Sequence, residues 1–83
     1  MKKLYVGNLP YSVNNEGLAE LFAQFGEVVS AVVILDRQNN NRSKGFGFVE
    51  FADDSAAEKA MAEMNGTEVE GRELKVNEAK PMN

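Results

Sequence analysis

Along this chain the spacing of the apolar residues switches between that of a strand and that of a helix, and the order of the switches leaves few possible folds. Strand-like segments, either alternating or continuously β-branched, occur at 4–7, 28–35, 44–51 and 73–77. A segment with apolar residues at helical spacing lies between the first two strands, and a second one lies between the last two. The predicted order of elements is therefore βαββαβ.

Both predicted helices have recognisable ends. The first begins after a cap at Asn14 and ends at Gly26, and the second begins after a cap at 53–55 and ends at Asn65-Gly66. Their apolar stripes are expected in the core: Leu18, Leu21, Phe22, Phe25, Ala57, Ala60, Met61 and Met64. This order predicts an α+β fold of the ferredoxin-like kind, with two helices on one face of a four-stranded antiparallel sheet and the other face open.

The 83 residues leave room for one domain, expected over 1–80, and for a frayed tail at 81–83. No apolar run is long enough to span a bilayer and no signal-peptide pattern follows Lys2-Lys3, so we expect a cytoplasmic protein without a membrane partner. We also expect a monomer. Cysteine and histidine are absent, which argues against thiolate or imidazole catalysis and against transition-metal sites. We therefore expect no enzyme activity, no cofactor, no bound metal and no small-molecule substrate.

The strand at 44–51 cannot turn all of its aromatic rings toward the helices. Alternation directs Val49 and Phe51 to the core, and it then directs Phe46 and Phe48 to the open face. The glycines at 45 and 47 are expected to leave room for aromatic core residues beneath them. An apolar patch on an uncovered sheet face usually marks a binding site.

The first strand adds a third ring to this face, because the same alternation turns Tyr5 outward beside Lys3. Flat rings flanked by cations suit nucleobases, since stacking contributes about 1 to 3 kcal/mol per base. Ordinary core packing of the three aromatic residues is the alternative that alternation alone leaves open.

The octapeptide 44–51, KGFGFVEF, resembles the RNP1 motif of the RNA recognition motif family at every position, and the hexapeptide 4–9, LYVGNL, resembles its RNP2 motif. The resemblance covers nearly the whole chain, which is similar to small single-domain bacterial and organellar members of the family. It implies single-stranded RNA binding, with a base stacked on Tyr5 and another on Phe48, sugars packed on Phe46, and Lys44 at a phosphate. The RNA-binding residues expected from this resemblance are Lys3, Tyr5, Asn8, Arg42, Lys44, Phe46, Phe48, Lys75, Asn77, Ala79 and Lys80.

Two features depart from the pattern of that family. Val32 and Ile34 are expected on the open face, where family members often carry polar or basic residues. The net charge is -4. The predicted helices hold most of the excess of acidic over basic residues, with Lys59 as their only cation. The acidic residues of this helical face are Glu16, Glu20, Asp53, Asp54, Glu58 and Glu63. A protein-interaction domain of the same fold, using the acidic face or the surface of Val32 and Ile34, is therefore the alternative function.

Overall fold

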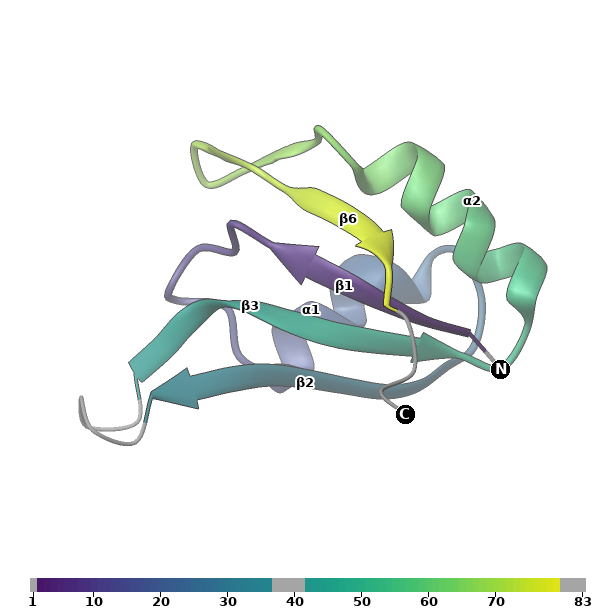
Figure 1. The fold of residues 1–83 in the computed structure, drawn as a ribbon, viewed down its shortest axis with the longest axis horizontal. Helices are drawn as coiled ribbons and strands as arrows, with labels where there is room; N and C mark the ends of the chain where they lie inside the picture. Colours follow the sequence, from purple (N-terminus) through teal and green to yellow (C-terminus); the bar gives the residue numbers. More distant parts are fainter. Residues whose placement is uncertain (1, 37–41, 80–83) are drawn as a thin grey trace.

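The computed structural model describes residues 2–36 and 42–79 and has the predicted layered arrangement (Figure 1). The elements of this arrangement are β1 (Lys2–Gly7), α1 (Asn15–Ala23), β2 (Val28–Asp36), β3 (Arg42–Phe51), α2 (Asp54–Met64) and β6 (Lys75–Glu78). The antiparallel sheet has the strand order β2-β3-β1-β6, and α1 lies behind it in Figure 1. Because α1 packs mainly on β2 and α2 on β6 and β1, the structure confirms the predicted α+β, ferredoxin-like fold.

The two predicted helix caps are present. The Asn14 side chain accepts a hydrogen bond from the Gly17 N–H at 2.8 Å, and the Asp53 carboxylate accepts one from the Ser55 N–H at 2.9 Å. The end of α1 was predicted too late, because the chain leaves the helix at Ala23. The last turn then tightens: the N–H groups of residues 25 and 26 bond to the carbonyls of residues 22 and 23.

A short hairpin between α2 and β6 was not predicted. It consists of β4 (Glu68–Val69) and β5 (Arg72–Glu73), joined by Glu70 and Gly71, which both have positive φ angles of 50° and 82°. Two successive residues with positive φ are typical of tight hairpin turns. Glu73, which we expected in the last strand of the sheet, therefore belongs to this hairpin.

The connection between β2 and β3 is shorter than predicted at both ends. The strand-like segments at 28–35 and 44–51 predict a loop over 36–43 between them, whereas β2 extends to Asp36 and β3 begins at Arg42. Antiparallel pairing continues that far, with Asp36 opposite Arg42. Residues 37–41 of the predicted loop and the predicted tail at 81–83 lie outside the described residues.

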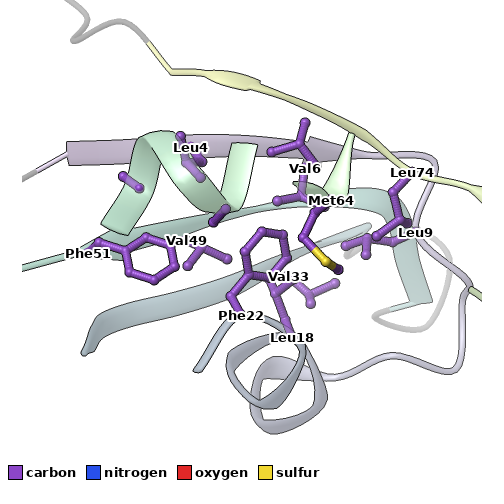
Figure 2. Packing of buried hydrophobic residues seen from close by; sticks show 13 residues of the cluster. Leu4, Val6, Leu9, Leu18, Phe22, Val33, Val49, Phe51, Met64 and Leu74 are labelled. Carbon is purple, nitrogen blue, oxygen red and sulfur yellow. The ribbon is translucent and has the colours of Figure 1, made fainter. Parts of the chain in front are cut away.

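The core lies between the sheet and the helices, and Figure 2 shows how its side chains interlock. Phe51 from β3 and Phe22 from α1 are fully buried, with ring centroids 6.3 Å apart in an edge-on contact. Phe25 and Met61, also predicted as core residues, are partly buried and pack against it. The burial of Phe51 and Val49 confirms the predicted facing of β3.

Gly47 makes room for backbone and an aliphatic side chain, so the expectation of aromatic residues beneath it was wrong. A Cβ atom at Gly47 would collide with the Val32 carbonyl oxygen and would lie 3.1 Å from a methyl group of Leu18. The absence of a side chain at this position therefore lets α1 approach the sheet closely.

Asparagine side chains satisfy one backbone N–H at each edge of the sheet. At the β2 edge the Val33 N–H donates to the Asn15 side-chain oxygen at 2.7 Å, and at the β6 edge the Val76 N–H donates to the Asn65 side-chain oxygen at 3.0 Å. Both asparagines lie at helix ends. Since free edge N–H groups are where another strand adds, these bonds restrict strand addition at Val33 and Val76.

Candidate nucleic-acid interface

Three aromatic side chains form a cluster on the sheet face that is opposite the core. Tyr5 projects from β1, and Phe46 and Phe48 project from β3, alternating with the buried residues of each strand. Tyr5 is the register partner of Phe48, and the ring centroids in the cluster lie 5.7, 5.9 and 6.3 Å apart. All three side chains are half-buried, so the core-packing alternative is wrong for them.

The rings touch at angles and do not stack on one another. Tyr5 is tilted by 34° to Phe46 and by 65° to Phe48, and the two phenylalanines are at 88° to each other. The two contacts of Phe48 are edge contacts, which are favourable between aromatic quadrupoles. Because none of the three rings lies flat against another, their faces stay available for a flat ligand.

Gly7 determines how the Tyr5 ring lies. A Cβ atom at Gly7 would be 2.8 Å from the Tyr5 hydroxyl oxygen and 2.9 Å from its Cε1 atom. The ring therefore leans along β1 over Gly7, toward Phe46, which is the register partner of Gly7. Gly7 was not among the residues expected at the interface, although a small residue two positions after an outward aromatic residue was the available signal.

The cations predicted for the interface occupy different surroundings. The Lys3 ammonium lies 5.6 Å from the Phe48 ring centroid, a cation–π geometry at an exposed side chain. Lys75 lies opposite Gly7, and its ammonium is 3.5 Å from a carboxylate oxygen of Glu73. The structure therefore brings one cation directly to the cluster. The predicted contacts of Lys80 and of the Arg42 and Lys44 side chains lie outside what the structure describes.

Lys2, which was not predicted to contact RNA, interacts with carboxylates of the protein. Its ammonium lies 3.4 Å from Glu58 and 3.6 Å from Glu78, and its side chain is 19% exposed. Partial desolvation acts to lower the pKa of Lys2, but the hydrogen bond and charge of Glu58, together with Glu78, raise that pKa above its usual value of 10.5. This lysine links the sheet to α2.

The last strand brings two predicted residues alongside β1. Asn77 is exposed and is the register partner of Tyr5, so its amide lies beside one ring of the cluster. Ala79 extends the pairing, because its N–H donates to the Lys3 carbonyl at 2.9 Å. The Asn77 amide can both donate and accept hydrogen bonds at a base edge.

The side chain of Asn8 is engaged within the protein. Its Nδ2 donates to the Glu73 carbonyl at 2.7 Å, and its Oδ1 accepts from Arg72 Nη2 at 2.9 Å. Asn8 itself has a left-handed φ of 59°, a conformation that asparagine tolerates well. The observed contacts join β1 to the hairpin, and a direct contact of Asn8 with RNA stays a prediction.

The β2 side of the open face is apolar. Val32 is the register partner of Phe48 and is 43% exposed, as predicted, and Ile34 is half-buried. Val29 and Leu35 add further exposed apolar area to β2. A flat ligand on Phe48 would therefore be bordered by an aliphatic side chain on this side.

Within 2–36 and 42–79 no cluster of acidic side chains is arranged to hold a metal ion. In the same part of the chain, no helix has the length and apolar character needed to cross a membrane.

These features define a small α+β domain with a half-buried aromatic cluster on its open sheet face. The family model described as RNA recognition motif matches residues 4–75, and the chain belongs to that family. It is 48% identical over 77 residues to glycine-rich RNA-binding protein 2, mitochondrial, of Arabidopsis thaliana, an alignment that covers 93% of this chain and 48% of that protein. The chain thus spans about half the length of this curated relative.

Solved structures of the family superpose closely. A crystal structure of an RNA-binding protein has a TM-score of 0.93 and 46% identity, covering 100% of this chain and 99% of that one. The RNA recognition motif of Rna15 with bound RNA (GU) has a TM-score of 0.85 and 30% identity, covering 95% of this chain and 83% of that one. Relatives include proteins named mitochondrial and chloroplastic, so the cytoplasmic location expected from the sequence stays a prediction.

Proposed function

We propose that this domain binds single-stranded RNA on the open face of its sheet and performs no catalysis. The observation that carries the proposal is the cluster of Tyr5, Phe46 and Phe48, whose rings lie within 5.7 to 6.3 Å of one another on the face away from the core. Membership of the RNA recognition motif family and the RNA-binding names of its relatives support the same conclusion.

Each ring has a separate task in this proposal. One base stacks on Tyr5 and a second on Phe48, and the spacing of the two rings suits adjacent nucleotides of one strand. Phe46, which lies beside Tyr5 at 5.7 Å, packs against the sugars between the two bases. Asn77 beside Tyr5 offers hydrogen bonds to a base edge, and Lys3 beside Phe48 offers a charge to a phosphate or a carbonyl group.

The proposed RNA is single-stranded because a base must leave its helix to lie flat on an aromatic ring. The bonds from Asn15 and Asn65 to the two sheet edges support a monomer as the binding species. The alternative, a protein-interaction domain that uses the acidic helical face or Val32 and Ile34, does not require three outward rings.

Titration of the domain with an RNA oligonucleotide, and with the same oligonucleotide annealed to its complement, tests this proposal. We expect the single strand to bind at least tenfold more tightly than the duplex, since unpairing and unstacking oppose binding to the rings. Equal affinity for both forms would exclude the stacking model. A matched titration of Phe48→Ala separates stacking from general attraction, because only stacking is lost in that variant.

A further inference from the structure

The connection between β1 and α1 and the β4–β5 hairpin lie at the same end of the sheet, where β3 begins (Figure 1). Tyr11 in this connection is 66% exposed, the largest fraction among the exposed large hydrophobic residues in the described part of the chain. It belongs neither to the core nor to the three-ring cluster. The function proposed above gives this ring no role.

The hairpin holds Tyr11 in place. The Arg72 guanidinium carbon lies 5.1 Å from the centroid of the Tyr11 ring, and Arg72 Nη2 donates to Asn8 Oδ1 at 2.9 Å. Asn8 in turn donates to the Glu73 carbonyl at 2.7 Å. These contacts place a guanidinium against one face of an exposed tyrosine, so the ring needs little further ordering before a ligand binds.

The same ring adjoins the strand that carries the aromatic cluster. Its Cε1 atom lies 3.3 Å from the position that a Cβ atom at Gly45 would take, and Gly45 precedes Phe46 in β3. Arg72 lies against one face of the ring and Gly45 at one edge, and the residue still exposes 66% of its surface. Tyr11 therefore lies at the end of β3 from which Phe46 projects, close in the chain to the aromatic cluster.

The charges around Tyr11 favour a base over a phosphate. The Glu70 carboxylate accepts hydrogen bonds from the Ser12 hydroxyl at 3.0 and 3.1 Å, which places a negative charge next to Tyr11 in the chain. Arg72 supplies one compensating positive charge, and its Nε–H is buried without a hydrogen-bond partner among the described residues. Glu70 and Arg72 carry opposite charges, so these two side chains together give an anion no net attraction, and a neutral aromatic ligand suits the ring face better.

We propose that Tyr11 is an additional stacking position that takes one further nucleobase of the same RNA strand, beyond the nucleotides held by the sheet. Arg72 is its positioning residue, and Asn8 holds Arg72. This inference rests on the proposed function and extends the RNA path from the sheet to the β1–α1 connection.

A length series of oligouridylates and oligoadenylates, from three to eight nucleotides, tests the inference. For the wild-type chain we expect affinity to rise by roughly 5- to 150-fold at the length that first reaches Tyr11, as one stacked base would produce. Tyr11→Leu keeps apolar volume but has no aromatic face, so it should lose this rise and keep the affinity for the shortest oligonucleotides. Tyr11→Phe should retain the rise. Denaturant melts of both variants identify any loss of folding.

The outcomes separate this inference from the proposed function. If Phe48→Ala weakens binding at every length while Tyr11→Leu follows the wild-type length dependence, RNA binding on the sheet stands and the Tyr11 position is excluded. If Phe48→Ala binds all lengths like the wild type, the stacking function itself fails. A loss of the rise in Tyr11→Phe as well as in Tyr11→Leu would also overturn the inference, because it would make the hydroxyl group, and not the ring face, the feature required.

Discussion

Tyr5 and Phe48 lie directly opposite each other in the β1–β3 pair, and their ring centroids are 5.9 Å apart on the open face. The two residues are far apart in the chain, so this spacing depends on the register of the two strands. A shift of β3 by one residue would replace Phe48 on this face with Gly47 or Val49 and would turn the aromatic residues into the core. The aromatic cluster of the open face and the core are thus determined by the same register.

Phe48→Ala should weaken RNA binding by about 1 to 3 kcal/mol, because one proposed stacking ring on the open face is lost, and should leave folding stability nearly unchanged. Phe51→Ala is the matched control from the buried side of the same strand. That change should reduce the free energy of unfolding by about 3 to 5 kcal/mol. Denaturant melts and binding titrations of both variants with one RNA check the pair, and the reverse pattern would place β3 in the opposite register.

Gly7→Ala should weaken RNA binding by roughly 1 kcal/mol with little loss of stability, because its methyl group displaces the Tyr5 ring and the ring can rotate away. Gly47→Ala should instead lower the free energy of unfolding by about 1 to 3 kcal/mol, since its methyl group meets the Val32 carbonyl and Leu18. Thermal melts and titrations of both variants distinguish an effect on ring orientation from an effect on packing. A stable Gly47→Ala would contradict the close approach of α1 to the sheet.

Asn15→Ala should expose the Val33 N–H at the β2 edge and reduce the free energy of unfolding by about 0.5 to 1.5 kcal/mol. Amide hydrogen exchange provides a direct measurement, because the Val33 amide should exchange faster in this variant than in the wild type. Asn15→Asp keeps an acceptor oxygen and should preserve the protection. Unchanged exchange at Val33 in Asn15→Ala would show that the bond does not protect this edge.

The cap of α2 should make stability fall in acid. The hydrogen bonds from the Ser55 hydroxyl and the Ser55 N–H lower the pKa of Asp53 below its usual value of 3.8. A group with a lowered pKa in the folded state contributes stability above pH 3.8 that is lost as the pH falls through its folded-state pKa. Carboxyl-detected NMR titration should give this pKa, and Asp53→Asn, which keeps an acceptor but does not titrate, should reduce the acid dependence of unfolding.

RNA binding should weaken with added salt, but with a shallow slope. Lys3 lies opposite Glu50 in the β1–β3 pair and Lys75 is paired with Glu73, so few cations on the described face lack an acidic neighbour. Each phosphate contact to a single strand contributes about 0.7 to the log–log slope of affinity against salt. Titrations between low and physiological salt should give fewer than about five released ions. A larger number would show that more cations contact phosphates than the described face provides.

Much of the fold could be predicted from local patterns. Helical spacing and the capping residues Asn14 and Asp53 located both helices, and period-two alternation located the strands of the sheet. The outward facing of Tyr5, Phe46 and Phe48 followed from the same alternation, because the buried positions of each strand leave no other side for them. These features depend on neighbouring residues along one segment, which is why the sequence alone determined them.

The tertiary structure decided what depends on residues distant in the sequence. The β4–β5 hairpin shortens the last strand of the sheet. Its residues Arg72 and Glu73 form hydrogen bonds with Asn8, which the resemblance to the RNP2 motif had predicted to contact RNA. The position of Tyr11 follows from that contact. No local spacing indicates which side chains a remote hairpin will contact, because the contact forms only when the sheet brings 8–12 and 68–73 to the same end of the molecule.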